Sequence, residues 1–342
     1  MISVPSFAKI NLGLKIGARR PDGFHELRTI YQTLELHDVI RVDVQSGSSL
    51  EIGCDDPRVP LDRTNTCYKI AGLVTNSAAA SGKVVIEIQK HLPVQGGLGA
   101  ASSNAVVTML AMERALGIQL SSAEKQRIAA EVGSDLPLFL IGGTVLGIGR
   151  GEEVYGLPDL PTLHLVIVTP AVGVSTPRAF ARWDEWIAQQ PELTHPAGTG
   201  TISEFSQRVF AWLSKGIPRV EAARQAAASG EKAGPASGVP AGGGDRAETP
   251  LLDFVRTGIE NDFERVVFPE YPELREVKEL LWREGAQFAS LSGSGSTLYG
   301  VFASADDASA AAERMRAAGH AAVATTSLTR EEYWQAIGTA SP

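Results

Sequence analysis

A glycine-rich segment, PVQGGLGAASSN (Pro93 to Asn104), joins two apolar patterns of different period. Before it, apolar residues recur at every second position from residue 84 to 88, which is the period of a strand. After it, apolar residues recur at helical spacing from residue 106 to 116, and the pattern stops at Gly117. The segment therefore predicts a unit of strand, tight loop and helix.

Such a loop has two interpretations. Glycines allow backbone N–H groups to converge on one point, and a helix N-terminus adds about half a positive charge, so the loop can bind an anion such as phosphate. The alternative is a structural connection in which Ser102 or Ser103 caps the helix. No G-x-x-x-x-G-K-[ST] motif occurs, and Ser102 replaces the last glycine of G-x-G-x-x-G, so the two common nucleotide-binding loops are disfavoured. The glycines alone leave both interpretations open.

The N-terminal half also predicts an antiparallel sheet and further helices. Apolar residues occupy the even positions from residue 8 to 16, which indicates a half-buried strand, and a second alternating run spans residues 30 to 44. Ser121 and Glu124 form a capping-box pattern for a helix, and Asp135 stands just before a further helix start.

The C-terminal half predicts a mixture of helices and strands. We expect helices over residues 251–267, 272–284 and 305–318, and strands over residues 164–168, 288–291, 297–302 and 321–326. This order predicts an α+β layer that resembles a ferredoxin-like fold. The stretch from residue 226 to 249 is rich in Ala, Gly, Ser and Pro and has almost no large apolar side chain, so we expect a mobile insertion there.

Composition limits the classes of function. The chain has 342 residues, more than one typical domain, so we expect two domains. Its net charge of -8 argues against a nucleic-acid partner, and its apolar stretches are far too short to span a membrane. The two cysteines form neither a disulfide framework nor a zinc motif, which favours a reducing cytoplasm. Any anionic ligand must then be held by a local group of positive charges.

Three polar residues outside the loop are candidates for catalysis. Lys9 and Asn11 share one face of the first strand, and Asp135 follows a Gly-Ser pair. Singly, Lys9 fits a solvated strand face and Asp135 fits a helix cap. Together with the loop they supply an anion cradle, a stabilising charge and a proton acceptor, which are the parts that phosphoryl transfer needs.

A second glycine cluster, from Ser292 to Ser296 in LSGSGSTLYG, joins the last two strands before the final helix and strand. One interpretation is a hairpin turn. The other is a backbone loop that approaches a substrate or a phosphate closely. Spacing alone favours the hairpin turn.

Three motifs in the order AKINLGL, PVQGGLGAASSNA and LSGSGSTLYGVF resemble the three signature motifs of the GHMP kinases. The resemblance spans most of the chain and implies the two-domain α+β fold of that family. It implies an N-terminal domain like ribosomal protein S5 domain 2 over residues 1–160 and a ferredoxin-like C-terminal domain over residues 161–342, with the insertion at about 190–249. It also implies ATP and Mg²⁺ as cofactors, a small-molecule substrate, and a monomer or weak homodimer in the cytoplasm.

Further segments, RRPDGFHEL, QTLELHD, GSDLPLFLIGG and NDFERVVFPEYPEL, are similar to the branch of the family that phosphorylates 4-diphosphocytidyl-2-C-methyl-D-erythritol. The implied reaction is ATP-dependent phosphorylation of the 2-hydroxyl of this cytidine diphosphate-linked methylerythritol, in isoprenoid (terpenoid) precursor biosynthesis by the non-mevalonate pathway. The alternatives are a GHMP kinase for another alcohol, such as homoserine or mevalonate, and a non-catalytic nucleotide-binding homologue. An aromatic clamp formed by Phe24, His25 and Phe180 favours the methylerythritol substrate over another alcohol. Retention of both Lys9 and Asp135 weighs against a non-catalytic homologue.

The resemblance also implies roles for individual residues. Lys9 and Asp135 would face the hydroxyl to be phosphorylated, with Asn11 nearby. The residues implied for ATP are Asn65 near the adenine, Pro93 at the start of the loop, and Gly96, Gly97, Leu98, Gly99, Ala100, Ala101, Ser102 and Ser103 around the phosphates. The residues implied for the substrate are Phe24 and His25 at the cytosine, Phe180 on the other side of the ring, Thr176 nearby, and Gly293, Ser294 and Gly295 in the second glycine cluster. The metal ligands are left open.

The chain departs from the family pattern at several positions. The family loop usually reads G-G-G-L-G-G-G-S-S, whereas this chain has Gln95, Ala100 and Ala101 at three of its glycines. Alanine carries a penalty wherever φ must be positive, so these substitutions bear on the conformation of the loop. Phe24 stands where a tyrosine is common, which keeps the ring face and removes a hydroxyl.

Overall fold

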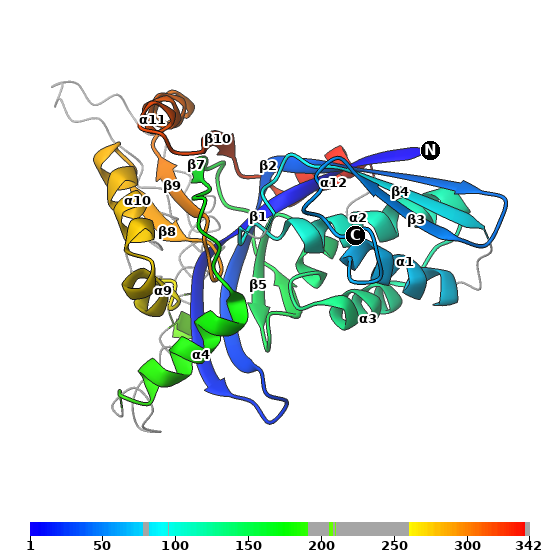
Figure 1. Ribbon diagram of the computed structural model, residues 1–342, viewed down its shortest axis with the longest axis horizontal. Helices are drawn as coiled ribbons and strands as arrows, with labels where there is room; N and C mark the ends of the chain where they lie inside the picture. The colour runs from blue at the N-terminus through cyan, green and yellow to red at the C-terminus, as the bar shows by residue number, and fades with distance from the viewer. Residues whose placement is uncertain (78–81, 95, 191–204, 208, 210–259, 339–342) are drawn as a thin grey trace, which may run out of the picture.

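The computed structural model describes residues 1–77, 82–94, 96–190, 205–207, 209 and 260–338. Gln95 and most of the insertion predicted at about 190–249 lie outside the described residues. Within these ranges the frame of the molecule is two β-sheets, each with helices on one face, which is the α+β arrangement predicted from the sequence (Figure 1). In the described part of the chain, no helix has both the length and the apolar character needed to cross a bilayer.

The first sheet is built on a long antiparallel hairpin. Strand β1 (Ile2–Arg19) pairs with β2 (His25–Gln45) along nearly its whole length. The last part of β2 then pairs with β4 and its first half pairs with β5, which gives the order β3-β4-β2-β5-β6. The other strands of this sheet are β3 (Leu50–Cys54), β4 (Lys83–Gln89), β5 (Thr144–Ile148) and β6 (Glu153–Gly156).

The prediction that the first strand is half-buried is wrong. Lys9, Asn11 and Lys15 lie on its polar face, and all three are buried. Each has a polar partner, as a buried charged or amide group requires; Lys15, for example, pairs with Asp262 at 2.9 Å. Alternation in a sequence shows which face a residue takes, but it does not show whether another layer covers the polar face.

Helices pack on one face of the first sheet (Figure 1): α1 (Thr66–Ser77), α2 (Ala100–Leu116) and α3 (Ser122–Val132). Every residue of α2 from Ser103 to Glu113 is buried, because this helix lies between the sheet and α1. The capping box predicted at Ser121 and Glu124 is confirmed at the start of α3. The helix predicted after Asp135 is a short 3₁₀ turn, η1 (Pro137–Leu140).

The second sheet has the order β10-β7-β9-β8 and is antiparallel throughout. With the helices between its strands it follows the β-α-β-β-α-β order of a ferredoxin-like layer, as predicted. Its strands are β7 (His164–Val168), β8 (Phe288–Leu291), β9 (Leu298–Phe302) and β10 (Ala322–Thr326). Its helices are α4 (Thr176–Ile187), α9 (Glu264–Glu270), α10 (Pro272–Arg283) and α11 (Ala305–Ala317).

The helix predicted over residues 251–267 is wrong in its extent. Residues up to 259 lie outside the described part, and α9 begins only at Glu264. Just before it, Asn261 forms an isolated bridge to β1, and its side chain donates to the carbonyl oxygens of Leu291 and Gly293 at 2.8 and 2.7 Å. An asparagine that bonds to backbone groups in this way competes with helix formation.

A shared core joins the two halves of the molecule. Ile10 and Leu34 contribute from the hairpin, Leu165 and Tyr299 contribute from the second sheet, and all four are fully buried. The hairpin therefore packs against helices at one end and against the second sheet at the other, so it holds the two halves in a fixed relation.

Helix α12 (Arg330–Ile337) follows the second sheet in sequence, but it packs on the hydrophobic core between the first sheet and its helices. The fully buried Tyr333 donates from its hydroxyl to the carbonyl oxygen of Phe139 at 2.8 Å. The division of the chain into domains 1–160 and 161–342 stays a prediction.

Candidate active site

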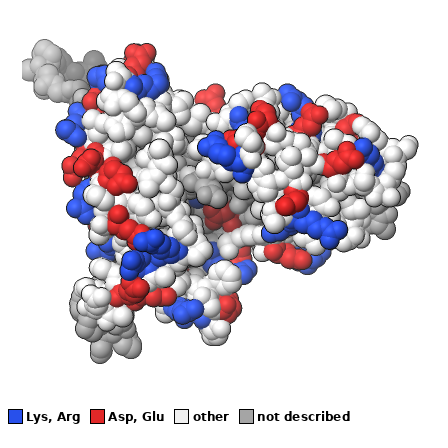
Figure 2. Space-filling model, in the orientation of Figure 1, with Lys and Arg blue, Asp and Glu red and all other residues white. Residues whose placement is uncertain are grey.

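A cleft of ≈ 1040 Å³ lies between the two halves. It is lined by the polar face of β1, the first glycine segment, the start of α4 and the second glycine cluster. Figure 2 shows the hollow between the halves, with basic and acidic side chains interspersed over this face of the molecule. Of the residues predicted for catalysis, ATP and substrate, all but Ser103 and Gly295 line this cleft.

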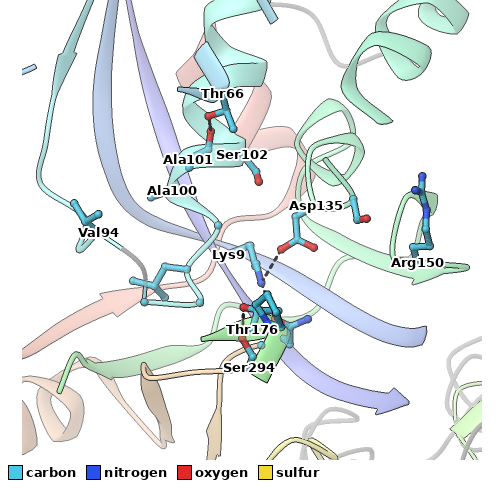
Figure 3. Close-up of a pocket in the computed structure, with 18 of the residues that line it drawn as sticks. Lys9, Thr66, Val94, Ala100, Ala101, Ser102, Asp135, Arg150, Thr176 and Ser294 are labelled. Atoms are coloured by element: carbon cyan, nitrogen blue, oxygen red, sulfur yellow. Dashed lines mark hydrogen bonds and ion pairs between the residues drawn. The ribbon is translucent and has the colours of Figure 1, made fainter. Parts of the chain in front are cut away.

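Lys9 and Asp135 meet in the cleft (Figure 3). Lys9 Nζ lies 3.2 Å from Asp135 Oδ2 and donates to Asn11 Oδ1 at 2.7 Å. Asn11 is fixed in turn by donating to Thr29 Oγ1 at 2.7 Å. The Lys9 side chain is 3% exposed and that of Asp135 is 35% exposed. The structure thus places an enclosed cation beside a carboxylate that is open to the cleft.

The backbone of the first glycine segment accepts hydrogen bonds from β1 and from the second glycine cluster. Lys9 N donates to Leu98 O at 2.9 Å, and Ser292 Oγ donates to Gly97 O at 3.0 Å. Gly97 and Gly99 have φ angles of 80° and 69°. A Cβ at Gly97 would lie 2.3 Å from Ser292 O, and a Cβ at Gly99 would lie 2.9 Å from Lys9 Cγ. Glycine is therefore required at both positions by conformation and by space.

Helix α2 begins directly after Gly99, which is its N-cap, and no side chain caps its first turn. The alternative prediction, in which Ser102 or Ser103 caps this helix, is therefore wrong. N–H groups in the first turn of a helix have no intrahelical acceptor, and Ala100, Ala101 and Ser102 line the cleft. Figure 3 shows the Ser102 side chain directed into it. The helix thus presents its positive end to the cleft, which is an arrangement that binds phosphate.

The alanines that replace family glycines do not strain the loop. Ala100 and Ala101 are the first two residues of α2, where alanine is the most favourable residue. The positive φ angles lie at Gly97 and Gly99, which this chain retains. Gln95, the third departure, lies outside the described residues.

Ser103 and Gly295 do not reach the cleft. Ser103 is fully buried; its N–H donates to Gly99 O at 2.9 Å and its hydroxyl accepts from Ser6 Oγ at 2.8 Å. The N–H of Gly295 donates to Ser292 O at 3.0 Å and closes the second glycine turn. Their geometry gives no support to the prediction that these two residues contact a ligand.

The residues predicted to hold the cytosine lie together at the cleft. His25 stacks on Phe180, with ring centroids 4.9 Å apart and an interplanar angle of 10°. His25 Nε2 lies 2.6 Å from Asp184 Oδ1, and Phe180 meets Phe263 edge to face at 4.9 Å. Because the His25 and Phe180 rings are in contact, no base can lie between them in this structure.

Phe24 is the more accessible aromatic residue of this group, with half of its surface exposed. The guanidinium of Arg150 lies 4.8 Å from the centre of its ring, and Arg150 Nε donates to Glu152 Oε1 at 2.9 Å. A cation held over one ring face leaves the other face of Phe24 for a stacking partner.

Three further predicted residues, Asn65, Thr176 and Ser294, bond to other groups of the protein. Asn65 donates to Pro60 O at 2.7 Å and accepts from Cys67 N at 2.8 Å, so both ends of its amide shape the loop before α1. Thr176 Oγ1 and Ser294 Oγ lie 2.7 Å apart, which links the start of α4 to the second glycine cluster (Figure 3).

Basic side chains outnumber acidic ones on the lining of the cleft. The charged residues there are Lys9, Arg19, Arg58, Lys90, Arg150, Asp135 and Asp184. Four of the five basic side chains pair with carboxylates, namely those of Lys9, Arg58, Lys90 and Arg150, so their charge is partly offset. Among the residues that the structure describes, no group of three or more His, Cys, Asp or Glu side chains is placed to hold a metal ion.

Among the cleft residues that sequence reasoning missed are Tyr31, Arg150 and Asp184. Tyr31 donates from its hydroxyl to Asp135 Oδ1 at 3.1 Å. Asp184 could have been found, because it lies one helical turn after Phe180. Tyr31 and Arg150 carry no such signal, because the contacts of Tyr31 with Asp135 and of Arg150 with Phe24 join segments far apart in the sequence.

Comparison with known proteins identifies the family. The GHMP kinases N terminal domain matches residues 65–143, and the GHMP kinases C terminal domain matches residues 251–321. The chain is 32% identical over 317 residues to the 4-diphosphocytidyl-2-C-methyl-D-erythritol kinase of Acaryochloris marina, covering 91% of this chain and 90% of that protein. It is 33% identical over 298 residues to the protein of that name from Solibacter usitatus, covering 87% and 80%. A crystal structure of 4-(cytidine 5'-diphospho)-2C-methyl-D-erythritol kinase matches with a TM-score of 0.67 and 28% identity, covering 95% of this chain and 99% of that chain. With this identity over nearly its whole length, the chain belongs to the GHMP kinase family.

Proposed function

We propose that the protein is an ATP-dependent kinase that phosphorylates the 2-hydroxyl of 4-diphosphocytidyl-2-C-methyl-D-erythritol, in the biosynthesis of isoprenoid precursors. The products are the 2-phosphate and ADP. The observation that carries the proposal is the meeting of Lys9 and Asp135 in one cleft with the uncapped start of α2. The names of the relatives and of the matching crystal structure support the choice of substrate.

In the proposed reaction the substrate hydroxyl gives its proton to Asp135, and its oxygen attacks the γ-phosphorus of ATP. A new O–P bond forms, the bond to the bridging oxygen breaks, and ADP leaves with the electron pair. Asp135 suits the role of base because its carboxylate is open to the cleft. Lys9 suits the role of electrostatic stabiliser because its enclosed ammonium concentrates positive charge near the transferred group.

The first glycine segment and the first turn of α2 bind the ATP phosphates in this proposal. Their N–H groups replace water around the phosphate oxygens, and the helix end adds positive potential. The contacts of Gly97 and Leu98 with the rest of the cleft fix this cradle before the ligand arrives. Preorganised donors stabilise charge without the cost of reorientation during the reaction.

We propose that Mg²⁺ accompanies ATP. This ion is usually bound by substrate phosphates, waters and one or two protein oxygens. Ser102 would hold it, because its hydroxyl is directed into the cleft beside the phosphate cradle. When bound, the ion would neutralise part of the negative charge of the phosphates.

The aromatic end of the cleft is proposed to bind the cytosine. Phe24 offers a half-exposed ring for stacking, and Phe180 offers a second aromatic ring on the lining of the same cleft. His25 offers a ring nitrogen that Asp184 orients at 2.6 Å. A GHMP kinase for homoserine or mevalonate has no base to bind and no use for these residues.

A coupled ADP-release assay tests the proposal. The methylerythritol substrate, homoserine and mevalonate are offered side by side at one ATP concentration, with Asp135→Asn as the catalytic control. We expect ADP release with the cytidine-bearing alcohol, and phosphorus NMR should show a new phosphate monoester. If the enzyme prefers homoserine or mevalonate, the proposed substrate is wrong. If the protein binds ATP but releases no ADP with any of the alcohols, the chain is a non-catalytic homologue.

We also propose a cytoplasmic location and a monomer or weak homodimer. The location is supported by Cys54 and Cys67, which are both free thiols. Analytical ultracentrifugation over a range of concentrations measures the oligomeric state.

A further inference from the structure

Tyr31 contacts both members of the Lys9 and Asp135 pair. Its hydroxyl donates to Asp135 Oδ1 at 3.1 Å, and Lys9 Nζ lies 5.4 Å from the centre of its ring. The side chain is buried on β2 and lines the cleft. Tyr31 therefore touches the proposed base through its hydroxyl and the proposed cation through its ring face.

Two glycines make room for this tyrosine. A Cβ at Gly147 on β5 would lie 2.5 Å from Tyr31 Cε2. A Cβ at Gly151, in the turn after β5, would lie 2.6 Å from the Tyr31 hydroxyl, at a φ of +102°. A side chain at either position would displace the ring or the hydroxyl. The surrounding fold therefore fixes the hydroxyl next to Asp135.

Asp135 needs such a partner because of its place in the fold. It lies on the short turn between α3 and η1, and about a third of its side chain is exposed. The terminal torsion of an aspartate has broad preferences, so a single contact does not fix the carboxylate plane. Tyr31 binds Oδ1 and Lys9 faces Oδ2, and these two contacts together orient the group.

Tyr31 is a donor in this contact. Burial, followed by the negative charges of Asp135 and Glu152, raises the pKa of Tyr31 well above its usual range. The charged or titratable groups around the carboxylate are Lys9 on β1, Tyr31 on β2, and Arg150 with Glu152 on the turn after β5. A neutral hydroxyl that donates to a carboxylate favours its ionised form.

We propose that Tyr31 is a positioning residue for phosphoryl transfer, whose hydroxyl orients the Asp135 carboxylate toward the substrate hydroxyl. Tyr31 acts through Asp135 and takes no proton itself. The inference rests on the proposed function and deepens it, since it adds a third residue to the Lys9 and Asp135 pair.

Single-turnover phosphorylation, with enzyme in excess and rapid quenching, tests the inference with Tyr31→Phe. This variant keeps the ring, its packing and its contact with Lys9. The chemical rate should fall by about 10- to 100-fold, the loss expected for one hydrogen bond to a charged group, with KM for ATP unchanged. Tyr155→Phe, at an exposed tyrosine on β6, is the matched control.

Gly151→Ala tests the same contact from the other side. Its added methyl group pushes on the Tyr31 hydroxyl, whereas in a Tyr31→Phe background that oxygen is absent and only the strain at positive φ remains. The rate losses caused by the two changes should therefore multiply less than fully. The chemical rate of the double variant should lie within about twofold of the rate of Tyr31→Phe alone.

Two results would overturn the inference: a Tyr31→Phe rate within twofold of the wild-type rate, or rate losses from Tyr31→Phe and Gly151→Ala that multiply fully in the double variant. The wild-type measurement tests the proposed function separately, because it shows only whether the wild-type enzyme phosphorylates the methylerythritol substrate. The ratio of variant to wild type is taken on whichever alcohol the wild type accepts.

Discussion

Replacing Gly97 with alanine should weaken ATP binding through one identified contact. The new Cβ would lie 2.3 Å from Ser292 O and 3.3 Å from Gly295 O, and neither backbone atom can rotate away. Gly97 has a φ of 80°, where a residue other than glycine costs about 1–2 kcal/mol. Relief of the clash moves the first glycine segment off the second cluster, which breaks the 3.0 Å bond from Ser292 Oγ and costs about 1 kcal/mol more.

The combined cost of Gly97→Ala is then roughly 2–3 kcal/mol. Because the strained segment is the proposed phosphate cradle, KM for ATP should rise by roughly 30- to 150-fold where it reports binding. Steady-state kinetics measure this KM, and thermal unfolding measures stability. Gly72→Ala is the matched control: it lies in α1 with nothing within 4 Å of its Cβ. There the same change should raise stability by about 0.5–1 kcal/mol and leave KM unchanged.

Two outcomes separate the parts of this reasoning. If Gly97→Ala changes neither KM for ATP nor the melting temperature, the contact between the two glycine clusters is refuted. If the melting temperature falls while KM for ATP stays constant, the contact holds and the segment has no part in binding ATP.

Three further predictions concern the chemistry, the substrate and the response to pH. Asp135→Asn keeps the side-chain shape and removes the proton acceptor, so kcat should fall by about 10²–10⁴-fold with KM for ATP little changed, and Lys9→Met should cost at least as much. Steady-state kinetics check both, and a near-normal kcat in Asp135→Asn, with chemistry limiting turnover, would make Asp135 a structural residue. Phe180→Ala should weaken binding of the cytidine-bearing substrate by roughly 1–3 kcal/mol, as measured by calorimetry. An unchanged Kd would mean that the cytosine does not stack on Phe180. Burial raises the pKa of the Cys67 thiol from 9.0 to about 12, so the stability that this thiol contributes is complete below pH 9 and is lost as the pH rises toward 12. Denaturant unfolding across that window should show a shallower loss in Cys67→Ala than in wild type, and equal slopes would contradict the assignment.

Elements specified by local patterns could be predicted closely from the sequence. The predicted strands at 164–168 and 288–291 match β7 and β8 residue for residue, and the helix predicted at 305–318 exceeds α11 by one residue. In each case the period of the apolar residues agrees with the packing that the tertiary structure imposes. Helix α4 was overlooked, although Ala179 and Trp183 are buried one helical turn apart in it.

Contacts between distant segments could not be predicted in this way. The bond from Tyr31 to Asp135 joins residues 104 positions apart, and the bond from Ser292 to Gly97 joins residues 195 positions apart. Neither has a periodic signal, because each depends on how the long hairpin and the second sheet bring loops together. The resemblance to a family identified Asp135 and Gly97, but it did not indicate the bond from Tyr31 to Asp135 or the bond from Ser292 to Gly97.

The site is better described by these contacts than by its separate motifs. Lys9 donates from its backbone to Leu98 in the glycine segment, and the side chain of Lys9 leaves no room for a Cβ at Gly99. The position of the lysine and the conformation of the phosphate cradle therefore determine one another. A change in either segment should act on both, because the ammonium and the N–H groups of the proposed cradle are held by the same contacts around the proposed place of phosphoryl transfer.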